Sequence, residues 1–182
     1  MDLTYFGHST FQIETEDVTL LFDPFFEENP HTETDPETLA PDVLLITHAH
    51  FDHFSDVEAV LEASDPLVIS NFEITQYVQE EYGHDAIQPL NEGGSVEFDW
   101  GYVESTHARH SSSFPDGSYG GVPNGFVLEL GDDVVYNTGD TAPFAEMKWV
   151  GDLWDVDVML APVGNVFTMG IYGALHSTEM VE

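Results

Sequence analysis

The chain has 182 residues, and its 35 Asp and Glu against 2 Lys and Arg give a formal net charge of −33 at pH 7. Residues 1–182 suit a single well-buried domain, and 42% apolar with 13% aromatic residues argue against a disordered acidic chain. The shortage of cations argues against nucleic-acid binding, and the lack of cysteine excludes disulfides and thiolate metal ligands.

The N-terminal third predicts β-strands followed by an acidic loop. The segments "LTYFGHSTFQIET" and "VTLLFDPF" are typical of strands, with breaks at Gly7 and near Glu16 and Asp17. The stretch "EENPHTETDPET" predicts a surface loop, because it is acidic and interrupted by proline. "DVLLIT", residues 42–47, is a short apolar run that indicates a buried strand.

The next segments alternate between helix and strand. Ser55 and Glu58 match a capping box, so we expect a helix from Asp56 onward. "LVIS" indicates a strand, and "FEITQYVQEEY" indicates a second helix.

The second half is mainly β in character. We expect strands at "SVEF", "YVEST", "GFVLEL" and "DVVYNT", separated by turns that contain glycine. A helix at "PFAEMKWVGDLW", a strand at "VDVMLAPVG" and a helix near "GALHSTEMVE" follow. Strands interleaved with helices predict an α/β (α+β) class, with sheets covered by helices.

The stretch "THAHFDHF", residues 47–54, carries three histidines and one aspartate within six positions. His48 and His50 are two apart, and in extended backbone both side chains point the same way, so one ion can meet both. Asp52 and His53 follow where the chain bends into the expected helix and can face a second ion. Imidazoles and carboxylates are ligands for zinc, manganese or iron. The alternative is an exposed polar loop with coincidental histidines.

The pattern HxHxDH after a buried strand resembles the signature of the metallo-β-lactamase superfamily. "YFGHSTFQIET", "LLFDPF", "NFE", "HSSS", "GDTAPFAEMK" and "PVGNVFTMG" also fall in the order seen in a family of metal-dependent hydrolases related to ascorbate-6-phosphate lactonase. The resemblance covers nearly all 182 residues. It implies a four-layer αββα metallo-β-lactamase-like sandwich that holds two divalent metal ions, zinc or manganese.

The resemblance also implies ligands from later strands. "THARHSSS" offers His107 or His110, and the family pattern places a histidine directly before the small residues, which favours His110. Asp140 in "NTGDT" matches an aspartate that bridges the two ions in the family. The alternative is that Asp140 is only a turn residue after the preceding strand. The implied ligands of the first ion are His48, His50, His110 and Asp140, and those of the second are Asp52, His53 and Asp140.

The implied second site is incomplete. In the family a further histidine follows the last helix, in a segment resembling P-x-H-Y, and we find no such segment up to Glu182. We therefore expect the sandwich to lack its last strand or strands, and the second metal site to be weak or empty. His176 is a poor substitute because it falls within a predicted helix. A sheet edge exposed in this way would favour a homo-oligomer.

Three further residues are candidates for supporting the ligands or contacting substrate. His8 in "GHS" and Asp23 in "DPF" match early family motifs, and a carboxylate such as Asp23 commonly orients a ligating histidine. The alternative for His8 is a packing residue at a strand end, and the alternative for Asp23 is a turn residue before Pro24. Asn165 in "GNVFTMG" is expected at the mouth of the site, although loop geometry alone could explain it.

The remaining candidates are expected at the surface. Arg109 adjoins His110, but in extended backbone neighbouring side chains point in opposite directions, which favours a surface role. His31 and His84 lie in polar, acidic surroundings and are expected to be solvated.

These features predict a metal-dependent hydrolase that acts on a small molecule. Paired metal ions lower the pKa of a bound water to about 7 and polarise the substrate oxygen. No GxSxG segment and no cysteine nucleophile occurs. We expect hydrolysis of an ester or, from the resemblance, a lactone, with Asp52 and His53 as catalytic residues. The alternatives are a phosphodiesterase or nuclease, which the missing basic patch disfavours, and a truncated, catalytically impaired metal-binding domain.

The charge indicates adaptation to salt. Repulsion among the carboxylates opposes compaction in dilute buffer, whereas at molar salt the Debye length of about 3 Å suppresses it. The composition resembles that of haloarchaeal cytoplasmic proteins. The first ten residues contain no basic region or long apolar run, and no stretch approaches the 18 apolar residues of a membrane span. We expect a cytoplasmic, halophilic protein that does not bind membranes.

Overall fold

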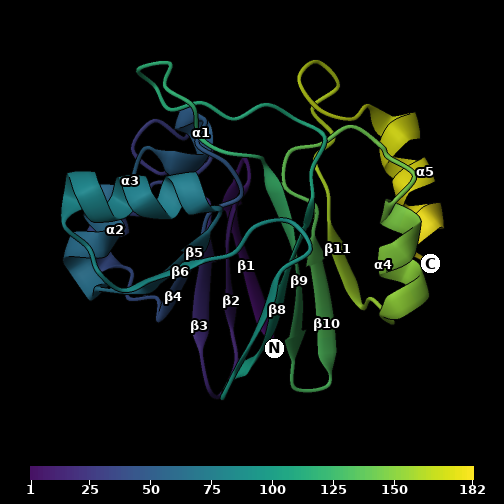
Figure 1. Cartoon of the computed structure of the whole chain (residues 1–182), viewed down its shortest axis with the longest axis horizontal. Coiled ribbons are helices and arrows are strands. Elements are labelled where there is room, and N and C mark those ends of the chain that lie inside the picture. The colour runs from purple at the N-terminus through teal and green to yellow at the C-terminus, as the bar shows by residue number, and fades with distance from the viewer. The chain divides into compact units, whose positions relative to one another are not determined.

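The computed structural model covers residues 1–182 and divides into two compact units, each built on one β-sheet (Figure 1). The first unit comprises residues 1–91 and 112–122, and the second comprises residues 92–111 and 123–182. The two sheets with their helices confirm the mixed α/β class. That the units together form one domain stays a prediction from chain length.

The sheet of the first unit has the strand order β1-β2-β3-β4-β5-β6. Its strands are β1 (Asp2–Gly7), β2 (Thr10–Glu14), β3 (Thr19–Phe22), β4 (Val43–Leu45), β5 (Leu67–Ser70) and β6 (Ile87–Pro89). The first three strands pair antiparallel, and β3 to β6 pair parallel. The predicted breaks at Gly7 and near Glu16 and Asp17 are confirmed, because β1 ends at Gly7 and residues 15–18 separate β2 from β3. Gly7 has a φ of 110°, a conformation that favours glycine.

Two helices cover one face of this sheet (Figure 1). The helical segments of the unit are the 3-10 turn η1 (Pro36–Thr38), α1 (Phe51–Phe54), α2 (Val57–Ser64) and α3 (Phe72–Tyr82). Apolar side chains of α2 and α3 are fully or almost fully buried against β4 and β5: Val57, Val60, Leu61, Ile74 and Val78 pack with Leu44 and Val68. Each such side chain stabilises the fold by about 1.5–3 kcal/mol.

The predicted capping box at Ser55 is wrong. Helix α2 begins at Val57 with Asp56 as its N-cap, and no side chain caps it. Instead, the Asp56 carboxylate accepts a hydrogen bond of 2.9 Å from the backbone N–H of Phe26, and the Ser55 hydroxyl donates to the same carboxylate oxygen at 2.6 Å. The local sequence pattern was overridden by a contact 30 residues away.

The expectation that His84 is solvated is also wrong. The chain leaves α3 through Gly83, whose φ of 67° turns it back toward the sheet. His84 is thereby 8% exposed, and its Nε2 donates to the carbonyl of Pro66 at 2.8 Å. The histidine is a structural residue that closes the α3–β6 connection.

The sheet of the second unit has the strand order β11-β10-β9-β8-β7. Its strands are β7 (Ser95–Phe98), β8 (Gly101–His107), β9 (Asn124–Leu130), β10 (Asp133–Asn137) and β11 (Val158–Leu160). Strands β7 to β10 pair antiparallel and β11 pairs parallel with β10. All five strands were predicted, although β11 is shorter than the apolar run that predicted it.

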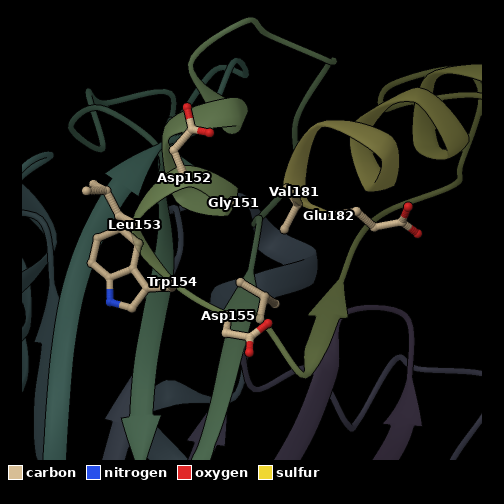
Figure 2. Close-up of a pocket in the computed structure, with 8 residues that line it drawn as sticks. Gly151, Asp152, Leu153, Trp154, Asp155, Val181 and Glu182 are labelled. Atoms are coloured by element: carbon tan, nitrogen blue, oxygen red, sulfur yellow. The ribbon is translucent and has the colours of Figure 1, made fainter.

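Helices α4 (Met147–Leu153) and α5 (Ile171–Val181) lie side by side in the second unit (Figure 1). They bury Met147, Val150 and Val181 against the sheet residues Val127 and Tyr136. Gly151 permits the close approach, because a Cβ there would lie 2.4 Å from the carbonyl oxygen of Val181. Figure 2 shows the pocket of about 430 Å³ beside this contact. No helix has the length and apolar character that crossing a bilayer requires.

Candidate metal centre

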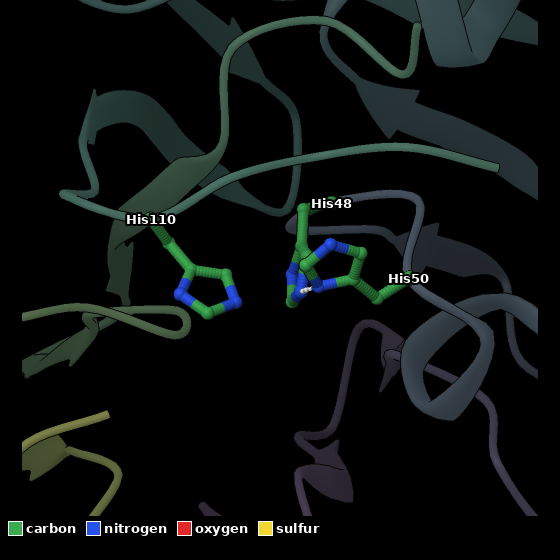
Figure 3. A group of neighbouring side chains, drawn as sticks. All are labelled: His48, His50 and His110. Carbon is green, nitrogen blue, oxygen red and sulfur yellow. Dashed lines mark hydrogen bonds between the residues drawn. The ribbon is translucent and has the colours of Figure 1, made fainter. Parts of the chain in front are cut away.

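The loop after β4 brings two histidine rings together. His48 is fully buried, and its Nε2 lies 3.0 Å from Nδ1 of His50, the contact drawn as a dashed line in Figure 3. Two nitrogen ligands of one tetrahedral zinc ion, each about 2.0–2.1 Å from it, lie about 3.3 Å apart. The two rings therefore fit a shared ion with little movement.

The buried carboxylate of Asp23 fixes the orientation of this loop. One Asp23 oxygen accepts the backbone N–H of Thr47 at 2.7 Å, and the other accepts the Thr47 hydroxyl at 2.7 Å. Since the Thr47 hydrogen is used on Asp23, its oxygen must accept the hydrogen bond of 3.0 Å from Nδ1 of His48. His48 then carries its proton on Nδ1 and has its lone pair on Nε2, the atom that faces His50.

Asp23 also holds His53. Its Oδ2 lies 2.9 Å from Nδ1 of His53, and both side chains are 1% exposed. A carboxylate on Nδ1 directs the Nε2 lone pair of the ring to the other side, which is the arrangement that ligating histidines commonly have. Asp23 therefore orients two of the three histidines in the HxHxDH stretch.

His8 and Asp52 lie at the exposed side of His53. Nε2 of His8 is 3.0 Å from Oδ2 of Asp52, and both side chains are partly exposed. The hydrogen bond from His8 is the largest of the influences that lower the pKa of Asp52 to about 2, against burial, which raises it. Asp52 is consequently a carboxylate at neutral pH. One donor atom from each of His8, Asp52 and His53 lies within 4.8 Å of the others, which suits a metal ion.

The supporting residues share an unusual backbone conformation. His8, Asp23 and Asn165 have φ values of 56°, 44° and 69°, a region that residues other than glycine rarely adopt. Such strain is often found at functional sites. At Asp23 it is held by the Thr10 hydroxyl, which donates to the Asp23 carbonyl at 2.7 Å.

The second unit places His110 beside Asp140. Nε2 of His110 lies 3.8 Å from Oδ2 of Asp140, and both side chains are nearly buried. Arg109 links the two segments, because its N–H donates to the Thr141 hydroxyl at 2.9 Å and its carbonyl accepts from the N–H of Ala142. The Arg109 residue itself is exposed.

The other histidine candidates have different surroundings. His107 directs Nδ1 toward Glu92 at 3.2 Å and packs edge-on against Phe144. His176 is 65% exposed on α5, 3.5 Å from Glu179. Asn165 lies in a loop closed by its own backbone bond to Met169, and a role for it at the mouth of the site stays a prediction.

The sequence matches the beta-lactamase superfamily domain over residues 2–182. The chain belongs to the beta-lactamase superfamily. Within the superfamily it is 42% identical to a UPF0173 metal-dependent hydrolase from Exiguobacterium, covering 100% of this chain and 82% of the relative. A relative from Methanosarcina mazei with the same name is 38% identical, covering 100% of this chain and 79% of that protein. The chain is thus a member of this family of metal-dependent hydrolases.

A solved structure supports the same assignment to the superfamily. Igni18, a metallo hydrolase from the hyperthermophilic archaeon Ignicoccus hospitalis, superposes with a TM-score of 0.85 at 34% sequence identity. The match covers 98% of this chain and 77% of that one. The metallo-β-lactamase-like fold predicted from the HxHxDH motif is confirmed.

One residue of this superfamily member's site was missed in the sequence. The Thr47 hydroxyl donates a hydrogen bond to Asp23 and accepts one from His48, so it links the two residues. The sequence pattern predicts Thr47 only as the end of a strand. The available signal was a hydroxyl residue directly before HxHxDH. A hydroxyl at a strand end can bridge a buried carboxylate and the next imidazole.

Proposed function

We propose that the chain hydrolyses a small ester or lactone with two divalent metal ions, zinc or manganese. The observation that carries the proposal is the Asp23 network, which fixes the tautomer of His48 and directs the lone pairs of His48 and His53 away from Asp23. A buried carboxylate that holds two imidazoles in this way is expected of a metal centre. Membership of a metal-dependent hydrolase family supports the same conclusion.

We further propose the two ligand sets that the family resemblance of the sequence implies. In that assignment, His48, His50, His110 and Asp140 would hold the first ion. Asp52, His53 and Asp140 would hold the second, with His8 as a further donor. Within the first unit, the donor atoms of His8, Asp52 and His53 lie within 4.8 Å of one another, which supports the second set.

The metal ligands, Asp52 and His53 would have different roles in hydrolysis. Divalent ions bound to such donors lower the pKa of a water to about 7 and polarise a substrate oxygen. Asp52 is a carboxylate at neutral pH and, held by the hydrogen bond that His8 donates, would help to position the attacking water. His53 is buried and held by Asp23 through Nδ1, which leaves its Nε2 as the donor atom for a metal ion.

The choice of substrate class rests on charge. The whole chain has two cationic side chains, Arg109 and Lys148, and Lys148 pairs with Asp152 at 2.6 Å on α4. A phosphodiester backbone normally requires several clustered cations. An uncharged ester or lactone is therefore favoured over a nucleic acid, and the lactone is suggested by the family resemblance of the sequence.

The proposal is tested by metal content and turnover in molar potassium chloride. Because His8 adds a donor to the second site, which the sequence alone predicts to be weak or empty, we expect two metal ions per chain by plasma emission spectrometry after dialysis. We also expect hydrolysis of at least one member of an ester and lactone panel in a pH-stat. His48→Ala should lower the metal affinity and the rate of hydrolysis by more than about 100-fold each. Loss of a group that only supports a metal ligand already lowers affinity or activity about 10–100-fold, and His48 is a proposed ligand itself. His176→Ala, at an exposed histidine of α5, is the control.

Three results would contradict the proposal. One ion or none per chain would remove the paired centre. Hydrolysis that survives in His48→Ala would place the chemistry elsewhere. Activity confined to phosphodiesters would overturn the substrate class while leaving the metal centre intact.

A further inference from the structure

The second unit contains a pocket that the metal centre does not use. It has a volume of about 150 Å³ and lies between β8, β10 and helix α4. His107, the histidine that does not lie beside Asp140, is at its edge. A cavity of this size accepts a molecule of about the dimensions of benzene.

Three residues of the pocket lining carry buried hydroxyl groups: Ser105, Thr106 and Tyr136. Tyr136 is completely buried. Its hydroxyl lies close enough to that of Thr106 to interact with it, and apart from each other neither hydroxyl has a hydrogen-bond partner. The buried hydroxyl of Ser70, by contrast, donates to the Ile46 carbonyl at 2.7 Å. A buried hydroxyl without a partner is destabilising, so the pair indicates a place that a ligand would satisfy.

Aromatic rings form much of the wall. The rings are those of Tyr136, Phe144, Trp149 and Trp154. Trp149 is 66% exposed although its indole is among the largest apolar groups of the unit. Exposed aromatic faces beside a pocket favour cations, because the ring face is electron-rich.

The charged groups around the pocket are acidic. Glu92, Glu104 and Glu146 contribute to the lining, which contains no lysine or arginine. The only side chain there that can become a cation is His107, and it is already within 3.2 Å of Glu92. An anionic ligand is thereby disfavoured, and a cationic one is favoured.

We propose that this pocket binds a compact organic cation, a cyclic or short-chain alkylammonium of benzene-like size. Its N–H groups would donate to the hydroxyl oxygens of Tyr136 and Thr106, its carbon atoms would contact the aromatic rings, and the surrounding carboxylates would balance its charge. The site does not depend on the proposed hydrolysis.

Piperidinium chloride and tetrahydropyran form a matched pair of probes, because they share a ring shape and differ in charge and in N–H donors. Both are titrated into the full chain in molar potassium chloride and followed by ¹H–¹⁵N correlation spectra. We expect saturable shifts of the Trp149 and Trp154 indole signals with piperidinium, with an affinity at least about tenfold above that of tetrahydropyran. The Trp100 indole, which stacks on Phe98 at 4.7 Å, should not shift.

Variants test the assigned contacts. Tyr136→Phe and Thr106→Val keep the pocket shape, and each should weaken piperidinium binding several-fold. Glu146→Gln, at an exposed position that should not affect folding, should do the same, with Glu179→Gln on α5 as its control. The proposal is overturned if no indole shift saturates, if tetrahydropyran binds equally well, or if all three variants bind as the parent chain does.

Discussion

The Asp23→Asn substitution tests the central network most directly. In the parent chain the carboxylate accepts three hydrogen bonds, two from Thr47 and one from His53. The asparagine oxygen can keep the bond to the Thr47 N–H, but its amide nitrogen meets two groups that also donate. With about 1.5–3 kcal/mol for a hydrogen bond to a charged group, and partial recovery as the Thr47 hydroxyl rotates, we expect a loss of about 2–4 kcal/mol in unfolding free energy.

The same substitution changes the protonation of His48. If the Thr47 oxygen accepts from the asparagine amide, its hydrogen turns toward Nδ1 of His48, which must then carry the lone pair. The proton of His48 moves to Nε2, the atom that faces His50. Metal affinity should therefore fall about 10–100-fold, the range found when the support of a ligating histidine is lost.

Two measurements separate these effects. Urea unfolding in molar potassium chloride with a chelator gives the stability, and competition with a chromogenic chelator gives the metal affinity. Asp42→Asn is the matched control, because Asp42 is exposed and accepts one backbone bond, from the N–H of Thr19 at 2.8 Å. A variant Asp23→Asn with lowered stability and unchanged metal affinity would refute the reasoning, since the network would then serve the fold alone.

Three further outcomes follow from the structure. Dialysis from molar potassium chloride into dilute buffer should reduce the far-UV circular dichroism signal, because repulsion at a net charge of −33 is no longer screened; an unchanged spectrum would contradict this. Burial raises the pKa of Tyr136 to about 12, so the stability it contributes is present below pH 10 and lost as pH rises toward 12. Tyr136→Phe should accordingly move the alkaline unfolding midpoint upward. His84→Ala should lower the unfolding free energy by about 1–3 kcal/mol through the unpaired Pro66 carbonyl, whereas His31→Ala, at an exposed site, should have little effect.

The long elements could be predicted from sequence because they carry their own boundary signals. Helix α3 has the predicted bounds, since Asn71 caps its start by accepting from the N–H of Ile74 and Gly83 ends it. The short elements α1 and β6 were not predicted, because four and three residues are too few to show a period. Their positions depend on contacts with distant segments.

In the metal centre, too, the local features could be predicted from the sequence and the long-range contacts could not. The HxHxDH stretch is local and could be recognised directly, whereas the link between Asp23 and Thr47 joins residues 24 apart and is invisible to spacing. The positive φ of Asp23 was equally hidden, since aspartate before proline is ordinary in turns. A motif could identify the candidate ligands, but not the groups that set their protonation.

His107 and His110 show why spacing alone could not separate two candidate ligands. Strand β8 ends at His107, which still pairs with Asn124 in the ladder and keeps its ring beside Glu92 and Phe144. Beyond it the backbone leaves the sheet, and the bonds from Arg109 to the segment after β10 bring His110 to Asp140. Two histidines three residues apart thus enter different environments because the strand ends between them. One lies with a carboxylate suited to a metal ion, and the other lies beside an acidic, aromatic pocket suited to an organic cation.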